Sequence, residues 1–299
     1  MARTLSVGLI QTSYGLDMDD NIARTIDLVR AAAAKGAQVI LPSELFQGPY
    51  FCVTQEEKWF ATAYPWREHP CVLALAPVAA ELGVAIPVSI YEREGPHYFN
   101  SLVMLDADGS PLGVYRKSHI PDGPGYQEKY YFRPGDTGFK VWETRFGRIG
   151  TGICWDQWYP EAARAMTLMG ADALFYPTAI GSEPHDSSLD TRDPWRRVMQ
   201  GHAVANVIPV IASNRIGTEP GPNNSGQGGG QSFYGSSFIA DHRGDLVEAF
   251  ERSDEGVLTH SFDLDFLRTH RAAWGFFRDR RTDLYEALGP RRTFEPAGG

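Results

Sequence analysis

Blocks of apolar residues alternate with blocks of mixed polarity along the chain, and their lengths predict strands and helices in turn. The short apolar run at residues 5–11 predicts a strand. The next block predicts a helix that starts at Asp19 or Asp20, both suitable capping residues, and ends near Lys35 before a glycine. A second buried strand is predicted over residues 38–44, with a polar tip at its carboxyl end. The amino-terminal part of the chain therefore predicts a strand–helix–strand unit.

The first half continues with a helix, a strand and a hairpin. The helix is predicted over residues 71–82 and the strand over residues 84–93. Residues 98–120 predict a hairpin, because Asp108 and Gly109 form a favourable two-residue turn between two apolar runs.

The second half repeats this order of elements. It predicts a strand with a sharp turn over residues 148–156, a helix over residues 159–171 with Pro160 in its first turn, and a strand over residues 173–180. It then predicts a helix that starts at Pro194 and ends at residue 206, a strand over residues 209–217 and a hairpin over residues 233–250. No linker separates the halves, so we expect one α/β domain over residues 1–299, with two pseudo-symmetric halves and a core at about residues 5–285. The glycine-rich stretch at residues 221–230 is expected to be a flexible surface loop.

Composition and charge narrow the classes of protein that fit. Hydrophobic residues make up 42% and aromatic residues 12% of the 299 residues, which is enough for a large core. The net charge of −9 argues against nucleic acid or an anionic membrane surface as the main partner, and it is compatible with a cationic small substrate. No apolar run approaches the roughly 18–20 residues needed to cross a bilayer.

The cysteines indicate a reducing environment. The chain has three, at positions 52, 71 and 154, and this odd number makes a disulfide framework improbable. The amino-terminal residues lack the apolar core and small-residue cleavage site of a signal peptide. We therefore expect a cytoplasmic protein.

Cys154 lies in the context that presents a nucleophile at the end of a strand. The segment GTGICWDQW places it after an apolar strand with two small glycines, and Tyr159-Pro160-Glu161 then opens a helix. A nearby helix start favours a thiolate, and backbone N–H groups after the cysteine can stabilise an oxyanion. The alternative is a buried cysteine that acts as a small hydrophobic residue, which is how we interpret Cys52 and Cys71.

Two further charged residues close buried strands. Glu44 follows VILPS directly, so partial desolvation of its carboxylate would suit general acid–base work. Lys117, in VYRKSHIP, could hold an oxyanion or pair with Glu44. Taken singly, each could also be an ordinary surface residue.

The combination of these three segments resembles a known family. LPSELF, YRKSHIP and GICWDQWYPE, in that order, are similar to the Glu–Lys–Cys segments of the nitrilase superfamily, and QEKYYFRPGD is similar to the segment that carries an additional glutamate, here Glu128. The likeness extends from GLIQTS to WGFFRDRRTDLY. Long stretches, such as SHIPDGPGYQEKYYFRPGDTGFKVW, are similar to the branch that hydrolyses N-carbamoylputrescine.

This resemblance implies a four-layer α-β-β-α sandwich and an amidohydrolase. Cys154 would attack the carbamoyl carbon, Glu44 would serve as general base and then acid, and Lys117 with the backbone N–H near Trp155 would hold the oxyanion. Glu128 would be the additional structural or catalytic glutamate. The resemblance implies no cofactor and a homo-oligomer of two or more subunits.

The distal end of such a cationic ureido substrate is an ammonium group, so its subsite should offer carboxylate or aromatic faces. Glu183 is the first candidate, because it follows the strand ALFYPTAI and so lies on the same rim as Cys154. Aromatic residues near the three segments could add cation–π contacts of about 0.5–2 kcal/mol each, and otherwise they pack in the core. These candidate substrate-binding residues are Tyr50, Tyr131, Trp155 and Trp158.

Several other functions find no support in the sequence. The histidines are scattered and form no HExxH motif, so a metal hydrolase is disfavoured. The glycine-rich stretch lacks a GK[ST] ending, and no GxSxG elbow is present. Two alternatives stay open: a sister amidohydrolase acting on N-carbamoyl-β-alanine or another linear amide, and a non-catalytic binding member of the fold.

Overall fold

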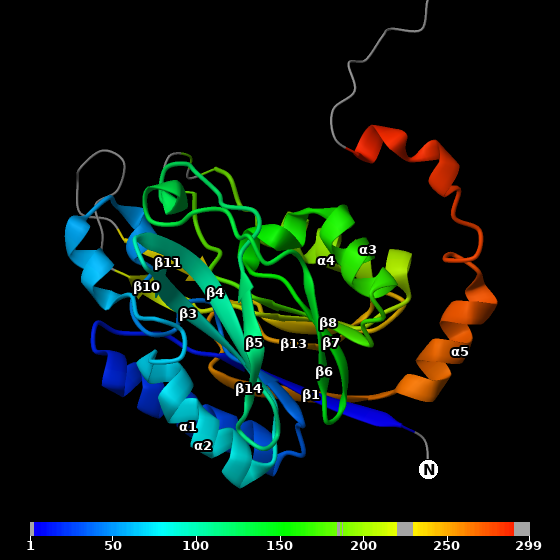
Figure 1. Cartoon of the computed structure of the whole chain (residues 1–299), viewed down its shortest axis with the longest axis horizontal. Helices are drawn as coiled ribbons and strands as arrows, with labels where there is room; N and C mark the ends of the chain where they lie inside the picture. Colours follow the sequence, from blue (N-terminus) through cyan, green and yellow to red (C-terminus); the bar gives the residue numbers. More distant parts are fainter. Residues whose placement is uncertain (1–2, 184–185, 187, 220–229, 290–299) are drawn as a thin grey trace, which may run out of the picture.

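Strands from the first half and one late strand form the first of two large sheets. The computed structural model describes residues 3–183, 186, 188–219 and 230–289 (Figure 1). Two three-stranded sheets, in the orders β14-β1-β2 and β3-β4-β5, are joined where Val39 bridges Ala85 and Ile40 N–H donates to the Ala85 carbonyl at 3.0 Å. The strands are β1 (Thr4–Gln11), β2 (Val39–Leu41), β3 (Ile86–Glu94), β4 (His97–Leu105), β5 (Pro111–Arg116) and β14 (Gly256–Asp263).

The second half forms a six-stranded sheet in the order β13-β12-β9-β8-β7-β6. Its central strands β7, β8 and β9 are parallel, and antiparallel strands complete both edges. The strands are β6 (Lys140–Thr144), β7 (Gly147–Thr151), β8 (Ala173–Pro177), β9 (Val210–Ser213), β12 (Phe238–Ala240) and β13 (Leu246–Ala249), and a separate pair is formed by β10 (Ile216–Glu219) and β11 (Gln231–Tyr234).

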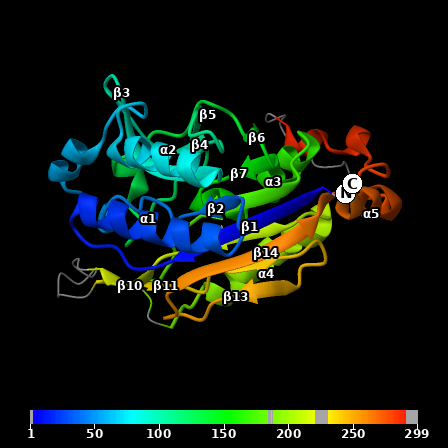
Figure 2. The same cartoon turned by 90° about the horizontal axis from the view of Figure 1, so that it is seen from below.

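The core lies in three layers between these sheets and their helices. Because side chains alternate across a strand, Leu5, Val7 and Leu9 of β1 face the second sheet and pack in one buried cluster with Phe175 and Ile211. The opposite faces of the sheets pack against helices (Figure 2). This is the α-β-β-α sandwich that the sequence predicted.

Two helices cover the outer face of each sheet. α1 (Met18–Ala34) and α2 (Pro70–Leu82) pack on the first sheet, and α3 (Pro160–Leu168) and α4 (Arg192–Asn206) pack on the second. α5 (Leu264–Trp274) follows β14 and leads into a carboxy-terminal segment that extends past α3 and α4 (Figure 1). No helix in the described part of the chain is long and apolar enough to span a membrane.

Three sequence predictions need correction. α1 is capped by Asp17, whose Oδ1 accepts from the N–H groups of Asp19 and Asp20 at 2.9 and 3.1 Å, so the cap lies two or three residues before the predicted one and the helix begins at Met18. α4 starts at Arg192, with Pro194 inside its first turn. The predicted strand at residues 38–44 is a strand over Val39–Leu41 followed by a turn.

The predicted hairpin at residues 233–250 is also different. Residues 233–234 pair with β10, and the hairpin proper is β12–β13. The break lies at Gly235 and Ser236, which both have positive φ, of 52° and 56°, so the strand cannot continue through them. The predicted loop at residues 221–230 lies outside the described residues, except for Gly230.

The ends of several strands meet at one place between the two sheets. β2 leads to Glu44, whose N–H donates to the Thr178 carbonyl just beyond β8 at 3.4 Å. The described part of the chain also contains six short 3-10 helices: Phe51–Val53, Glu57–Thr62, Glu128–Tyr130, Cys154–Trp158, Thr282–Leu284 and Glu286–Leu288. Two of them, η3 (Glu128–Tyr130) and η4 (Cys154–Trp158), contribute residues to this meeting point.

Candidate active site

Lys117 lies between two carboxylates in the interior of the protein. Its Nζ donates to Glu44 Oε1 at 2.9 Å and to Glu128 Oε2 at 2.7 Å, and all three side chains are fully buried. Two carboxyl groups therefore face one ammonium group in the buried interior. Such a buried cluster costs free energy unless its hydrogen bonds are well satisfied.

Neighbouring elements orient each member of this cluster. Lys117 follows β5 directly, and its backbone N–H donates to the Asn100 carbonyl at 2.8 Å. Asn100 Nδ2 also donates to Glu44 Oε1 at 2.7 Å. Glu44 Oε2 is buried and has no hydrogen-bond partner within the described part of the chain. Glu44 thus has one oxygen that is held and one that is available to accept a proton.

The surroundings shift the pKa values of this cluster in opposing directions. Burial raises the pKa of Glu128 to about 7, against the lowering effect of Lys117 and with a further rise from the charge of Glu44. Burial alone would lower the pKa of Lys117, but the carboxylates of Glu128 and Glu44 hold it well above its usual value. Lys117 is therefore an ammonium at neutral pH, and Glu128 is the group that titrates near it.

Cys154 is presented on a strained turn beside this cluster. It has a positive φ of 41°, unusual for a residue other than glycine and worth about 1–3 kcal/mol of strain. A Cβ at Gly152 would lie 2.8 Å from Tyr176 Cε1, so this close approach requires a glycine. Burial, and next the charge of Glu44, raise the pKa of the Cys154 thiol well above its usual value, although Lys117 opposes this. A neutral thiol at rest needs a base before it can attack.

A cavity of about 480 Å³ opens onto Cys154 and Glu128. Trp155, Trp158 and Glu183, three of the candidate substrate-binding residues, belong to its lining. The remaining lining residues are Pro121, Asp122, Gly123, Pro124, Tyr126, Ile180 and Thr191. Burial, and next the negative charge of Glu183, raise the pKa of Tyr126 well above its usual value, so these two groups lie close to each other.

The structure places Tyr50 and Tyr131 away from this lining. Tyr50 is 2% exposed and lies behind the carboxylate cluster, where its hydroxyl donates to Glu128 Oε1 at 2.7 Å. Tyr131 packs among other aromatic rings, and its hydroxyl donates to the Thr54 carbonyl at 2.7 Å. Tyr131 is close to Glu128 in sequence, but its ring packs against Phe51 and Phe60 and does not line the cavity.

Sequence reasoning missed several polar residues of this region, among them Asn100, Asp122, Tyr126 and Thr191. Asn100 is a buried polar residue within the apolar strand β4, and that exception to the pattern was a usable signal. Asp122 and Tyr126 lie in the segment between Lys117 and Glu128, where composition gives no such signal. Thr191 reaches the lining from the start of α4, a contact that depends on tertiary packing.

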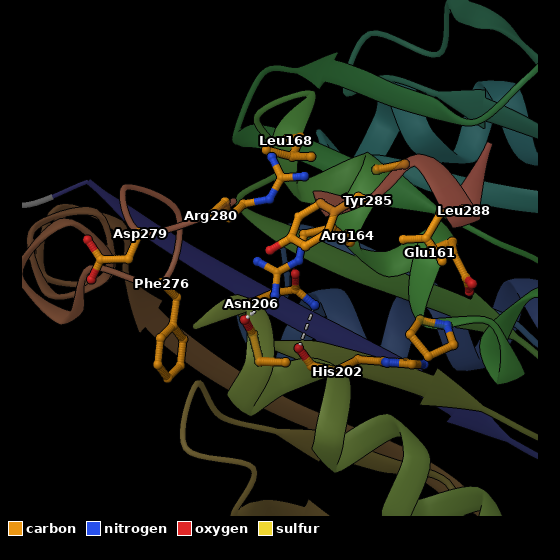
Figure 3. A pocket seen from close by; sticks show the side chains of 13 residues that line it. Glu161, Arg164, Leu168, His202, Asn206, Phe276, Asp279, Arg280, Tyr285 and Leu288 are labelled. Carbon is orange, nitrogen blue, oxygen red and sulfur yellow. Dashed lines mark hydrogen bonds between the residues drawn. The ribbon is translucent and has the colours of Figure 1, made fainter. Parts of the chain in front are cut away.

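A second, larger cavity of about 930 Å³ lies elsewhere and lacks the charged cluster. Figure 3 shows that one wall is formed by side chains of α3 and α4, such as Arg164 and Asn206, and the other by the carboxy-terminal segment, including Phe276 and Tyr285. Its lining includes neither Cys154 nor either buried glutamate. We therefore place the chemistry in the smaller cavity.

Comparison with known proteins places this arrangement in a family. The sequence profile of the carbon-nitrogen hydrolase family matches residues 6–272. A protein from Arabidopsis thaliana named N-carbamoylputrescine amidase is 55% identical over 291 residues, which cover 96% of this chain and 95% of that relative. A protein from Francisella tularensis subsp. tularensis named citrullinase is 48% identical over 284 residues, covering 95% and 98% of the two chains.

Solved structures agree with this placement. The crystal structure of a carbon-nitrogen hydrolase from Helicobacter pylori G27 superposes with a TM-score of 0.88 at 38% identity, covering 95% of this chain and 98% of that one. The resemblance to the nitrilase superfamily that the sequence indicated is thereby confirmed. Since the family profile and these relatives span nearly its whole length, the chain belongs to the carbon-nitrogen hydrolase family.

Proposed function

We propose that this protein hydrolyses N-carbamoylputrescine to putrescine, ammonia and carbon dioxide, with Cys154 as nucleophile. The observation that carries the proposal is the cavity itself, which joins a buried thiol to a lining that bears carboxylates and tryptophans. The relative from Arabidopsis thaliana, named for this reaction, supports the same substrate.

The first chemical step transfers the thiol proton to Glu44. Cys154 is a neutral thiol at rest, and the unpartnered Oε2 of Glu44 can accept its proton as the sulfur attacks the carbamoyl carbon. The oxygen of the tetrahedral intermediate becomes negative, and the Lys117 ammonium and the Trp155 backbone N–H stabilise it. Each well-aimed donor contributes about 3–4 kcal/mol to the barrier reduction. Glu44 then returns the proton to the departing nitrogen, and ammonia leaves.

The second step is hydrolysis of the carbamoyl-cysteine. Glu44 takes a proton from water, the hydroxide attacks the carbonyl carbon, and the C–S bond breaks as the thiol is re-formed. The product carbamate decays to carbon dioxide and putrescine. Forming a covalent intermediate divides the hydrolysis of an unreactive ureido group into two easier steps.

The cavity lining favours a substrate with a cationic tail. Asp122 and Glu183 provide negative charge, and Trp155 and Trp158 provide aromatic faces for an ammonium group. Of the lining residues that the structure describes, none is arginine or lysine. A carboxylate tail, as in N-carbamoyl-β-alanine, would therefore face repulsion here.

A ureido amino acid is the second candidate substrate, because the citrullinase relative is 48% identical over nearly the full chain. Citrulline carries the same ureido group, with an ammonium and a carboxylate on one carbon at the far end. Its ammonium would suit this lining, but its carboxylate would not find a cation among the lining residues that the structure describes.

Ammonia release from three substrates distinguishes these functions. We expect purified protein to prefer N-carbamoylputrescine over L-citrulline and N-carbamoyl-β-alanine, with no release by the control variant Cys154→Ala. Preference for citrulline would support the second candidate and overturn the first. Release by Cys154→Ala at the wild-type rate would remove Cys154 as the nucleophile.

The variant Glu183→Gln tests the ammonium subsite. A charged hydrogen bond contributes about 1.5–3 kcal/mol, so we expect kcat/KM for N-carbamoylputrescine to fall about 10–100-fold. N-butylurea, which has the same chain without the ammonium, is the matched control and should lose little. An equal loss on both substrates would show that Glu183 does not bind the cation.

We also propose a homo-oligomer in a reducing compartment such as the cytoplasm. Apolar side chains are exposed around the larger cavity, including Leu168 at 49% and Leu288 at 69%, and a second copy of the chain could cover them (Figure 3). All three cysteines are free thiols, which supports a reducing compartment.

A further inference from the structure

Arg215 is a fully buried arginine at the carboxyl end of β9, directly behind the turn that carries Glu44. Its Nη2 donates to the backbone carbonyls of Glu44 and Leu45 at 2.6 and 3.0 Å, and its Nη1 donates to the Gly48 carbonyl at 3.1 Å. One guanidinium therefore holds three carbonyls of the turn that follows β2.

This turn needs external support. Leu45, the residue after Glu44, has a positive φ of 48°, a conformation that is strained for a side chain of this size. Such a conformation persists where surrounding contacts enforce it. The planar, forked guanidinium of Arg215 can reach several carbonyls at fixed angles, which the single point charge of a lysine cannot reproduce.

A chain of contacts through Glu219 and Tyr50 connects Arg215 to Glu128, the other carboxylate of the cluster. Glu219, at the end of β10, accepts from Arg215 Nη1 on Oε1 at 2.6 Å, and its Oε2 accepts from the Tyr50 backbone N–H. The Tyr50 hydroxyl in turn donates to Glu128 Oε1. These contacts close a ring. On one side Lys117 contacts both Glu44 and Glu128. On the other side Arg215 and Glu219 connect the turn that carries Glu44 to Tyr50, which contacts Glu128.

A purely stabilising role explains this pair poorly. Burying an ion pair gains little over apolar side chains of similar size, because desolvation offsets the attraction. The guanidinium also leaves its Nε without a partner within the described residues. What the pair supplies is a fixed geometry for the segments that present Glu44 and Tyr50.

We propose that Arg215 and Glu219 form a positioning pair that sets the orientation of Glu44 and Glu128 around Lys117. This inference rests on the proposed role of Glu44 as the base. Neither residue lines the cavity, so the pair acts through the turn after β2 and through Tyr50. Its loss should lower the rate of the chemical steps more than it weakens substrate binding.

The variant Arg215→Lys keeps the charge and removes the fork. A displacement of about 1 Å in a catalytic group can cost about 100-fold in rate, so we expect kcat to fall about 10–100-fold. KM should change by less than about threefold, because the cavity lining is intact.

Arg196→Lys is the matched control. Arg196 likewise supports a residue with positive φ, Ser236. It donates to the carbonyl of Ser236 at 2.9 Å and to that of Phe250 at 2.7 Å, and it lies outside the cavity lining. We expect this variant to keep wild-type kcat. A kcat within threefold of wild type in folded Arg215→Lys would overturn the proposal, as would an equal loss in both variants.

Glu219→Gln is the second variant, and it carries the test if Arg215→Lys fails to fold. The neutral amide weakens the contacts to Arg215 and Tyr50, so kcat should fall again with little change in KM. In the double variant the losses should be less than multiplicative, because both substitutions break one ring. Unchanged kcat in folded Glu219→Gln would overturn the proposal.

Alkylation of Cys154 by iodoacetamide separates this proposal from the substrate assignment. The buried thiol must lose its proton to react, so the rate at pH 7 should fall in Arg215→Lys and stay unchanged in Arg196→Lys, with the alkylated residue identified by mass spectrometry. A protein that releases no ammonia from any ureido compound but shows this fall would refute the proposed function and retain the positioning pair. Equal alkylation rates in the two variants would count against the pair.

Discussion

Glu128 is a buried carboxyl group whose charge depends on its neighbours. Burial raises its pKa to about 7, while the Lys117 ammonium and the Tyr50 hydroxyl both favour its ionised form. Ionised Glu128 accepts from Lys117 Nζ on both oxygens, at 2.9 and 2.7 Å, and so holds the ammonium in place beside Glu44. We therefore expect kcat/KM to rise with pH through about 7.

The variant Tyr50→Phe tests this assignment. The hydroxyl of Tyr50 donates to Glu128, so its removal destabilises the carboxylate and raises the Glu128 pKa. The rising limb of the pH profile of kcat/KM should move to higher pH. Tyr131→Phe is the control, because the Tyr131 hydroxyl donates to the Thr54 carbonyl and not to Glu128. The rising limb of its pH profile should stay at the wild-type pH. An unmoved limb in Tyr50→Phe would show that another group titrates there.

At the scale of elements, one carboxylate links the turn of Cys154 to the segment of Lys117. Asp156, within η4, accepts from the N–H of Ile153 at 2.9 Å and from the Tyr115 hydroxyl at 2.6 Å. Its other oxygen accepts from His119 twice, from the backbone N–H at 3.0 Å and from Nδ1 at 2.7 Å. Two segments that bear catalytic candidates are thereby fixed to each other by a fully buried side chain.

We expect Asp156→Asn to impair both stability and turnover. An asparagine turns an NH₂ group toward donors that need an acceptor, and each buried group left unsatisfied costs about 1–3 kcal/mol. The free energy of unfolding in urea and kcat should both fall. The control is Asp241→Asn, because Asp241 accepts from the backbone N–H groups of Arg243 and Asp245 in the β12–β13 turn. The Asp241→Asn variant should lose some stability and keep its kcat. A fall in kcat in Asp241→Asn but not in Asp156→Asn would contradict the role of Asp156 in connecting the two segments.

At the scale of the whole molecule, the two outer helical layers differ in what lies over them. α1 and α2 have no further layer among the described residues, whereas the carboxy-terminal segment forms a wall of the larger cavity beside α3 and α4 (Figures 1 and 3). This segment exposes Leu284 at 65% and Leu288 at 69%. Apolar groups gathered in this way favour burial against another surface.

The double variant Leu284→Ser, Leu288→Ser tests whether this surface joins copies of the chain. We expect its mass by light scattering to fall relative to the wild type, because the interface loses apolar area at about 25 cal/mol per Å². Leu73→Ser, on α2 and 58% exposed, is the control and should keep the wild-type mass. A wild-type protein that is already monomeric would refute the proposed oligomer.

The sequence by itself determined the order of most strands and helices up to residue 250 and the sharp turn at Cys154, because these follow from local periodicity and glycine spacing. The resemblance of its segments to the nitrilase superfamily implied the sandwich. The sequence also singled out Glu44 and Lys117, since each closes a buried strand. It did not predict β6, β14 or α5. The cap at Asp17 was missed because two later aspartates compete for the same role by composition alone.

Only the tertiary structure decided which side chains support the chemistry. Arg215 lies 171 residues from Glu44 in the chain but donates to its carbonyl, and Tyr50 turns its hydroxyl to Glu128 while Tyr131 does not. These contacts arise where strand ends from the two sheets converge. Local patterns record which face of a strand is buried, but the partner across the interface depends on how the two sheets pack, and no short segment of sequence carries that information.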